Sequence, residues 1–492
     1  MKRVSVIGSG IGGLAIAVRL ALKGYKVSVY ESNSSPGGKA AEFSSNGYRF
    51  DKGPSLLTMP EKIDELFVLA GKSPKDYFKY TKLNESCRYF YNDGVVIKAY
   101  SEPIKFSEEI LKKTNTPIHK TKRYLSENEF IFKATSYLFL EKSLHKIKTY
   151  LSLKVLYSAM KIPFLNLFST MNEVNLKRFS NPKIVQLFNR YATYNGSNPY
   201  LAPAVLNSIS NLEFKKGAFF SEKGMSAIPK SIYKLALELG VKFYFNSKVE
   251  SIKVNNKSIE GVVVGKDFFP SKLVVCNTDI YYVYNNLLPK NQLNNYKKDE
   301  ERSSSAIIFY WGINMVFDQL QLHNILFSGD YQEEFKHISE GKTISNDPTV
   351  YINITSKKKT SDAPPNSENW FVMINVSHNK KQDWDDLILK ARKDIIRKIN
   401  STLNISIENH IVFEDTVDPR SIEAETHSFK GALYGTSSNS KESAFFRHPN
   451  FSKDIKGLYF CGGSVHPGGG IPLVLSSAKI VDELISEEYE KK

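Results

Sequence analysis

The sequence predicts an α/β fold with more than one domain. Residues 3–31 show the order strand, glycine turn, helix and strand, which is typical of a doubly wound α/β sheet. Residues 457–485 repeat the order strand, glycine-rich turn and helix near the other end of the chain. The chain has 492 residues, which is too long for one small hydrophobic core.

The first glycine turn has the spacing of a dinucleotide site. An apolar strand, Val4–Ile7, leads into Gly8, Gly10 and Gly13, which follow the pattern G-x-G-x-x-G at the start of a helix. Gly8 permits the tight turn, Gly10 lets the backbone approach a pyrophosphate, and Gly13 allows the helix to pack closely on the strand. A second strand ends on Glu31, whose carboxylate is placed to accept hydrogen bonds from ribose hydroxyls. This segment predicts a Rossmann-type dinucleotide-binding domain.

A second glycine-rich turn, "GGSVHPGGGIP" at residues 462–472, contains five glycines, two prolines and one histidine. An isolated cluster of this kind indicates a surface turn. Here, however, a short apolar strand, Gly457–Cys461, precedes the turn, and the helical pattern of Leu473–Ile485 follows it. Strand, glycine-rich turn and helix together favour another part of a cofactor site.

Composition excludes several classes of protein. The three cysteines are far apart and no Cys/His cluster has metal-ligand spacing, so we expect neither a disulfide framework nor a metal site, which suits the cytoplasm. No apolar run reaches the roughly 20 residues needed to span a bilayer. The net charge is +16, and residues 101–200 hold 16 Lys and Arg against 7 Glu and no Asp. No nucleic-acid motif accompanies this charge, so we expect no nucleic-acid partner.

The basic region includes a mixed basic and apolar segment, residues 141–171. Its helically spaced apolar residues are Leu144, Ile147, Leu151 and Val155, and the lysines among them are Lys142, Lys146, Lys148, Lys154 and Lys161. One interpretation is a core helix with a solvated lysine face. The other is a membrane-surface helix pair, in which apolar side chains enter the lipid and lysines meet anionic head groups.

Three further stretches carry a resemblance to a known family. "SPGGKA", residues 35–40, is similar to the turn beside the flavin in the superfamily of amine oxidases, protoporphyrinogen oxidases and carotenoid desaturases. "FDKGPS", residues 50–55, resembles the segment that passes the isoalloxazine in the carotenoid branch. "LYFCGGSVHPGGGIPLVLSSAKI", residues 458–480, resembles the C-terminal signature of the bacterial, FAD-dependent carotenoid and phytoene desaturases. Within that family, the residues of this segment are most similar to those of the hydroxycarotenoid 3,4-desaturases.

The resemblance implies that FAD is the cofactor. Residues 240–254 are similar to a hairpin whose backbone meets the adenine edge. Gly463 departs from the superfamily, because many members have there an Asp that binds a ribityl hydroxyl. The implied cofactor residues are Gly8, Ser9, Gly10, Ile11, Gly12, Gly13, Glu31, Gly38, Lys39, Gly53, Pro54, Ser55, Val249, Asn277, Gly462, Gly463, Ser464, Gly470, Ile471 and Pro472.

The implied architecture is an amine-oxidase/phytoene-desaturase-like FAD domain assembled from three stretches, with a mixed-sheet substrate domain and a basic helical cap that faces the membrane. The expected ranges are 1–95, 213–295 and 425–492 for the FAD domain, 96–212 for the helical cap, and 296–424 for the substrate sheet.

Residues 187–204, "LFNRYATYNGSNPYLAPA", resemble the segment that lines the substrate tunnel of the family. The substrate residues expected from it are Arg190, Tyr191, Tyr194, Asn195, Ser197 and Asn198. Phytoene desaturases are thought to use an Asp just ahead of this turn, but residues 132–197 contain no Asp and only two carboxylates, Glu141 and Glu173. No catalytic acid or base is therefore identified; His466 is named as a candidate, with a structural role in its loop as the alternative.

The function implied by the resemblance is desaturation of a carotenoid, with C-3,4 of a 1-hydroxylated carotenoid as the expected position. The alternatives are a phytoene or diapophytoene desaturase and, in another class, a non-enzymatic prenyl-lipid escort protein of the same fold. The expected partners are the carotenoid, an anionic membrane surface, and oxygen or a quinone as electron acceptor. The expected location is cytoplasmic, with peripheral membrane association.

Overall fold

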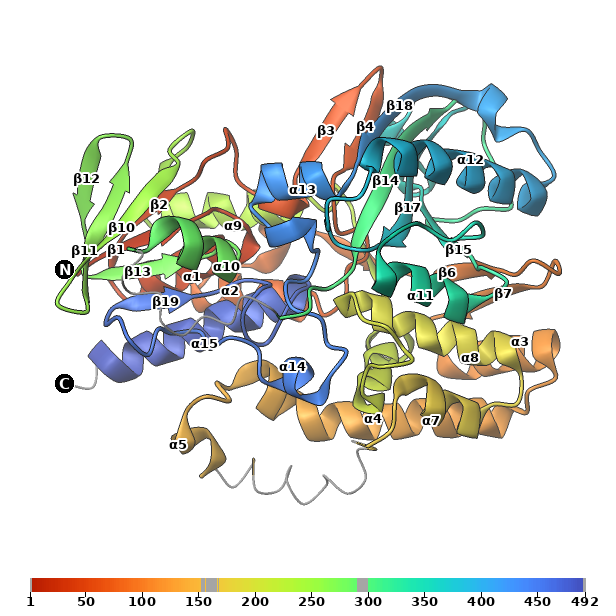
Figure 1. The fold of residues 1–492 in the computed structure, drawn as a ribbon, viewed down its shortest axis with the longest axis horizontal. Coiled ribbons are helices and arrows are strands. Elements are labelled where there is room, and N and C mark those ends of the chain that lie inside the picture. Colours follow the sequence, from red (N-terminus) through yellow and green to blue (C-terminus); the bar gives the residue numbers. More distant parts are fainter. Residues whose placement is uncertain (1, 152–154, 156–165, 167, 290–299, 490–492) are drawn as a thin grey trace.

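The computed structural model describes residues 2–151, 155, 166, 168–289 and 300–489. Figure 1 shows two sheet-containing halves side by side, with helices along one edge of both. Both chain ends lie at the outer side of the half that carries the first glycine turn. No helix of the described ranges is long and apolar enough to cross a membrane.

The first half is built on a five-stranded parallel sheet. Its order is β19 (Leu458–Phe460), β13 (Leu273–Cys276), β1 (Arg3–Ile7), β2 (Lys26–Tyr30) and β9 (Lys242–Tyr244). All four pairings are parallel, so three separate stretches of chain build one sheet, as the sequence predicts. The helices packed around it are α1 (Ile11–Leu22), α2 (Glu61–Leu69), α9 (Ala227–Glu238), α10 (Ile280–Tyr282) and α15 (Ile471–Tyr489).

A three-stranded antiparallel sheet follows β9. It consists of β10 (Val249–Asn255), β11 (Ser258–Val264) and β12 (Asp267–Pro270). The hairpin expected over residues 240–254 is therefore wrong, because β9 joins the parallel sheet while β10 pairs with β11. The connection continues along β2 instead of turning back: the Asn246 N–H donates to the Asn33 carbonyl, and the Ser247 N–H to the Glu31 carbonyl.

The second half is built on a seven-stranded mixed sheet. Its order is β18 (Ile411–Val417), β14 (Ser305–Ile313), β17 (Glu368–Val376), β16 (Val350–Asn353), β15 (His323–Leu326), β6 (Glu85–Phe90) and β7 (Val96–Tyr100). Helix α12 (Trp384–Leu403) packs on one face, where Trp311 and Trp370 are fully buried. The predicted boundary at residue 95 falls between β6 and β7, which pair with each other in this sheet. The substrate sheet thus includes strands from the N-terminal part of the chain.

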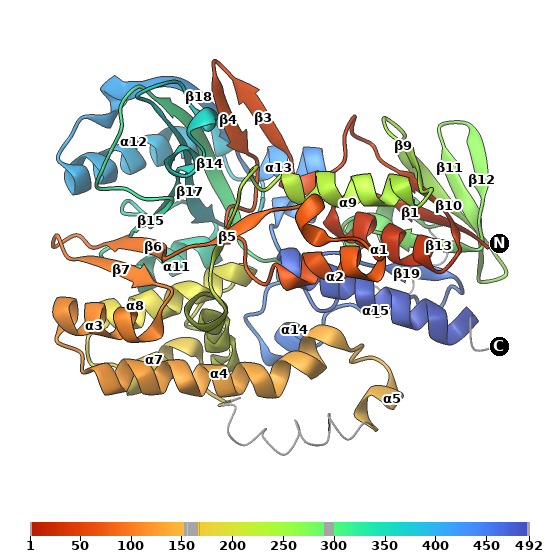
Figure 2. The same cartoon turned by 180° about the vertical axis from the view of Figure 1, so that it is seen from behind.

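Helices form the lower edge of the molecule in Figures 1 and 2. They are α3 (Pro103–Thr114), α4 (Ile118–Glu141), α5 (Ile147–Tyr150), α7 (Met171–Arg178), α8 (Pro182–Asn189) and α14 (Lys441–Phe445). The remaining helices are α11 (Tyr331–Glu340) and α13 (Pro419–Thr426), and the remaining strands are β3 (Glu42–Ser45), β4 (Tyr48–Asp51), β5 (Tyr80–Lys82) and β8 (Phe219–Ser221). In the segment 141–171, for which a core helix or a helix pair is expected, α4 ends at Glu141 and the short α5 spans Ile147–Tyr150. Lys154 and Lys161 lie outside the described residues.

A buried arginine joins the two halves. The Arg49 guanidinium, on β4, donates to Asp51 at 2.5 and 3.0 Å and to Asp362 beside the seven-stranded sheet at 3.3 Å. Asp51 in turn accepts from the backbone N–H groups of Met225 and Ser226, just before α9 of the parallel-sheet half. Both aspartates are buried; Asp362 also binds Lys359, whereas Asp51 pairs with Arg49.

We expect Arg49→Met to lower the free energy of unfolding by about 3–5 kcal/mol, because it leaves the buried Asp51 carboxylate without its cation and removes one of the two cations bound to Asp362. Urea denaturation of the flavin-free protein measures this change. The matched control is Arg123→Met, whose side chain is 72% exposed and pairs with Glu127 on the same helix, and which should cost no more than about 1 kcal/mol. Equal losses for the two variants would contradict the assignment.

Candidate active site

A cavity of about 660 Å³ extends from the parallel sheet to the face of the seven-stranded sheet. At one end it is lined by Gly8, Gly10 and Glu31, which follow the carboxyl ends of β1 and β2. At the other end it is lined by side chains of β6, β15, β16 and β17. Ligands of open parallel sheets bind outside the carboxyl ends of the strands, so this end of the cavity is the nucleotide site that the fold provides.

The first glycine turn is packed against the neighbouring strand end. A Cβ on Gly13 would lie 2.0 Å from the Gly8 carbonyl oxygen, so the helix could not approach the strand with any other residue there. Cβ atoms on Gly10 and Gly12 would lie 2.9 and 2.5 Å from the side-chain amide of Asn277, which occupies the space beside the turn. Helix α1 begins here without a side-chain cap from any described residue. Its first N–H groups fit a diphosphate, as helix N-termini in such sites do.

Glu31 is held rigidly in the cavity wall. One carboxylate oxygen accepts from the backbone N–H of Ser9 at 2.7 Å and from its hydroxyl at 2.8 Å, and the other accepts from the Asn33 N–H at 2.9 Å. The oxygen that Asn33 binds also accepts from the Ser32 hydroxyl at 3.3 Å, a long bond that a ribose hydroxyl would replace. Ser9 is fully buried behind Glu31, and Gly13 lies within the helix; neither is among the lining residues, so both act on the site through their neighbours.

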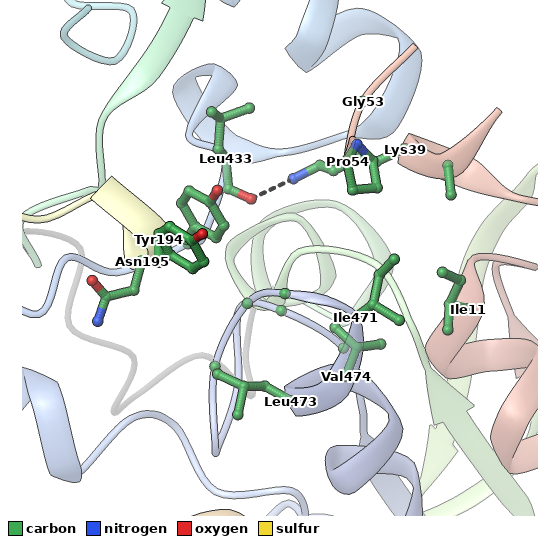
Figure 3. Close-up of a pocket in the computed structure, with 18 of the residues that line it drawn as sticks. Ile11, Lys39, Gly53, Pro54, Tyr194, Asn195, Leu433, Ile471, Leu473 and Val474 are labelled. Carbon is green, nitrogen blue, oxygen red and sulfur yellow. Dashed lines mark hydrogen bonds between the residues drawn. The ribbon is translucent and has the colours of Figure 1, made fainter. Parts of the chain in front are cut away.

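The remaining cofactor residues expected from the sequence line the same cavity. They are Gly8, Gly10, Ile11, Gly12, Glu31, Gly38, Lys39, Gly53, Pro54, Ser55, Val249, Asn277, Gly462, Gly463, Ser464, Gly470, Ile471 and Pro472. Figure 3 shows Ile471, Leu473 and Val474 at the start of α15 on one side of the cavity, with Gly53 and Pro54 across from them. The Ser464 hydroxyl oxygen accepts from the Ile280 N–H at 2.9 Å, which orients this turn.

Lys39 closes one wall of the cavity. Its Nζ donates to the Leu433 carbonyl oxygen at 2.9 Å, the dashed bond in Figure 3. Burial lowers the pKa of Lys39 to about 8, and the nearby Asp279 carboxylate partly opposes that effect. The bond fixes residues 38–39 against the segment that leads to Tyr434.

His466 is bound to the backbone of a neighbouring element. Its Nε2 lies 2.9 Å from the Lys142 carbonyl oxygen, which can only accept, so Nε2 carries the proton and Nδ1 is bare. Burial lowers the pKa of His466 to about 4, so the ring is neutral and a weak base at neutral pH. This geometry favours the structural role of His466, which ties the glycine-rich turn to the end of α4, over the catalytic one.

The predicted substrate residues separate into two groups. Arg190, Tyr194 and Asn195 line the cavity, and Tyr194 and Asn195 are seen together in Figure 3. Tyr191 lies behind them, fully buried. Ser197 and Asn198 are not among the residues that line the cavity. The Ser197 hydroxyl accepts from the Ser438 N–H of a distant segment, and the Asn198 side chain accepts from the Tyr200 N–H within the turn.

A polar cluster that the sequence did not reveal stands among apolar walls. Glu213 is 1% exposed and accepts hydrogen bonds from the hydroxyls of Tyr191 and Tyr194, and from Arg190 at 3.2 Å. Its charge is thus compensated within the protein. The apolar walls include Phe132, Phe139, Leu140, Val205, Ile209, Ile325, Phe371 and Met373. Glu213 lies beyond the Asp-free span 132–197. In the sequence, the apolar neighbours Leu212 and Phe214 are the one local sign that it is buried.

The comparisons with known proteins agree with this site. Residues 11–481 match the model of the family described as flavin containing amine oxidoreductase. The 1-hydroxycarotenoid 3,4-desaturase of Flavobacterium sp. is 48% identical over 99% of both chains. The 4,4'-diaponeurosporene oxygenase of Staphylococcus aureus is 31% identical over 100% of this chain and 99% of its own.

Solved structures show the same fold at low identity. Cyclohexylamine oxidase from Brevibacterium oxydans superposes with a TM-score of 0.62 at 13% identity over 99% of both chains. An oxidoreductase from Methanosarcina mazei gives 0.61 at 14% identity over 98% of this chain and 100% of its own. The chain belongs to the flavin-containing amine oxidoreductase family, within its carotenoid desaturase branch. It is an FAD-dependent oxidoreductase, which confirms the fold class, cofactor and enzyme class expected from the sequence.

We expect Gly10→Val to weaken FAD binding at least about tenfold, since the added methyl groups would enter the cavity beside Asn277 and hold the dinucleotide away from the turn. The measurement is the flavin-to-protein absorbance ratio after purification and dialysis. Gly329→Val is the control, because its Cβ would meet only the side chains of Asn92 and Asp347. Wild-type flavin content in the Gly10 variant would show that the dinucleotide does not bind at this turn.

Proposed function

We propose that this enzyme introduces a C–C double bond into a carotenoid, at C-3,4 of a molecule with a 1-hydroxyl end group. The observation that carries the proposal is a cavity with apolar and aromatic walls that contains one buried polar cluster near the predicted flavin segment. A hydrocarbon fits the walls, and a single polar end group fits the cluster. The 48% identical relative acts, by its name, on 1-hydroxycarotenoids.

The role of the chain in this reaction is to bind, orient and exclude water. Glu31 and the glycine turns hold the dinucleotide, and the apolar walls keep the reacting carbons dry. When bound, FAD would supply the redox chemistry by accepting a hydride from one carbon, and a water or the reduced flavin would accept the proton from the neighbouring carbon. Oxygen or a quinone is the proposed acceptor of the two electrons.

A phytoene or diapophytoene desaturase remains the second candidate. It is favoured by the apolar character of most of the cavity, since such substrates carry no polar end. The two candidates differ in whether the substrate can bind the buried polar atoms of the cavity that have no partner among the described residues, such as Asn195 Oδ1. A pure hydrocarbon leaves these atoms without a partner, at a cost of about 1–3 kcal/mol.

We expect the wild-type enzyme, reconstituted with FAD in liposomes, to prefer a 1-hydroxylated carotenoid over its 1-deoxy counterpart by about tenfold to a hundredfold in kcat/KM. The rate of the absorbance shift as the conjugated system lengthens gives both constants. A ratio near one with turnover of both substrates would reject the hydroxyl-selective function and favour the general desaturase.

We also propose that the edge formed by α4, α5 and α14 docks on an anionic membrane. Phe168 is 93% exposed, Ile147 is 82% and Leu151 is 78%, which leaves three large apolar side chains in water. Lysines accompany them: Lys146 and Lys148 are on or next to α5, and Lys441 Nζ lies 4.0 Å from the centre of the Phe168 ring. Insertion of the apolar groups with lysines at the head groups is the arrangement of interfacial helices.

The cavity reaches this same edge. Phe139 of α4 and Phe445 of α14 both line it, with ring centres 4.6 Å apart, and Phe446 beside them is exposed. A carotenoid dissolved in lipid would therefore reach the cavity between α4 and α14 without crossing water.

We expect the combined variant Ile147→Ser, Leu151→Ser, Phe168→Ser to bind anionic vesicles more than about tenfold more weakly than wild type, because each buried apolar side chain contributes about 1.5–3 kcal/mol. Co-sedimentation measures the partition. Leu389→Ser with Val412→Ser is the control, since these exposed apolar residues lie on α12 and β18 at the opposite edge. Equal vesicle binding by the wild type, the triple variant and the control would show that the α5 region is a solvated surface and not a membrane-docking one.

A further inference from the structure

The position of the substrate hydroxyl is fixed by covalent geometry if the proposed function holds. An oxygen on C1 is three bonds from C3, so it lies within about 4 Å of a reacting carbon. A reacting carbon lies about 3–3.5 Å from its partner atom in a productive complex. The group that binds the hydroxyl must therefore line the cavity close to the segment that passes the flavin ring, residues 53–55.

His323 meets this condition. It is the first residue of β15, is 3% exposed and lines the cavity. Its Nδ1 lies 2.8 Å from the Tyr351 hydroxyl, which lies 2.7 Å from the hydroxyl of Ser55. Two hydrogen bonds thus connect the imidazole to the predicted flavin segment.

The neighbours of His323 also fix its tautomer. The Asn353 side-chain amide donates one proton to the Leu322 carbonyl at 2.9 Å and faces His323 Nδ1 at 3.1 Å with the other. An Nδ1 that accepts from this amide is bare, so the proton of the neutral ring is on Nε2. Burial, reinforced by the nearby Arg190, lowers the pKa of His323 to about 3, so the ring stays neutral at physiological pH.

The Nε2 atom of His323 is buried and has no hydrogen-bond partner among the described residues. A buried N–H without a partner costs free energy, and native proteins rarely leave one unsatisfied. A ligand oxygen in the cavity would supply the missing acceptor. The Tyr194 hydroxyl nearby is bound to Glu213, and the Arg190 guanidinium is bound to Glu213 through Nη2. The Arg190 Nε has no partner among the described residues, but no hydrogen bond connects it to residues 53–55 as the Tyr351 hydroxyl connects His323.

We infer that the Nε2–H of His323 is the donor that binds the substrate's 1-hydroxyl oxygen and so determines specificity for oxygenated carotenoids. Asn353 and Tyr351 are the positioning residues that hold this tautomer. The inference rests on the proposed function and goes beyond it, because it identifies the group that recognises the hydroxyl and the direction of the hydrogen bond.

The test compares two nearly isosteric replacements. His323→Gln keeps an N–H near the position of Nε2, whereas His323→Met has the same shape without it. For each, kcat/KM is measured with the 1-hydroxylated carotenoid and with its 1-deoxy counterpart, together with flavin content. We expect His323→Met to lower the hydroxy-to-deoxy ratio about tenfold to a hundredfold and His323→Gln to restore most of it. His337→Met on α11, outside the cavity lining, is the matched control.

The outcomes separate the inference from the proposed function. A wild-type ratio near one rejects the function itself. A high wild-type ratio that survives in His323→Met, but falls in Asn195→Leu, keeps the function and moves recognition to the unpartnered Asn195 Oδ1. If neither His323 variant folds, the wild-type enzyme is measured with a 1-methoxy carotenoid. Because an ether oxygen can accept a hydrogen bond from an N–H, kcat/KM for the 1-methoxy and the 1-hydroxy substrate should both exceed that for the 1-deoxy compound. Preference for the hydroxyl alone would overturn the donor assignment.

Discussion

The cavity exists because two sheets are held at a fixed separation, and the buried Arg49 network is the interaction that fixes it. Arg49 binds Asp51 and Asp362, and Asp51 binds the backbone at the start of α9, so one cation connects β4, the seven-stranded sheet and the parallel-sheet half. A buried charge network of this kind tolerates little displacement, since movement would break the hydrogen bonds of Arg49 with two buried carboxylates. The dinucleotide end and the substrate end of the cavity are therefore positioned relative to each other by residues that line neither the polar cluster nor the glycine turns.

The apolar side chains and the polar groups of the cavity have different effects on a bound substrate: the first contribute affinity and the second orientation. Apolar and aromatic side chains would bind a long conjugated hydrocarbon without regard to direction or register along the chain. Direction requires a polar contact at one place, and the buried His323 and the Arg190–Glu213 pair provide it near the predicted flavin segment. Between apolar walls, a polar group without a hydrogen-bond partner costs more free energy than it does in water. A small polar group at the end of a large substrate can therefore determine which of its bonds reacts.

The sequence predicted the parts of the site that depend on local backbone geometry. The glycine spacing before α1, Glu31 at the end of β2 and the turn before α15 are set by nearby residues, and each can be identified in a short stretch. Residues that depend on long-range packing were missed or misassigned. His323 on β15 lies opposite Asn353 on β16. Glu213 pairs with Arg190, which lies 23 residues before it, in a segment without a recognisable motif. Ser197 and Asn198 resemble tunnel residues in the sequence, but the Ser197 hydroxyl accepts from the distant Ser438 N–H. The Asn198 side chain accepts from Tyr200 within its own turn, as short polar side chains in turns commonly do.

The most direct test of the account is an anaerobic single-turnover experiment with the FAD-loaded enzyme in liposomes and a 1-hydroxylated carotenoid. We predict loss of the oxidised flavin absorbance at the same rate as the carotenoid spectrum shifts, with one new double bond per flavin. The 1-deoxy carotenoid should bind but bleach the flavin far more slowly. Formation of the double bond without reduction of the flavin, or equal rates for the two carotenoids, would contradict the account.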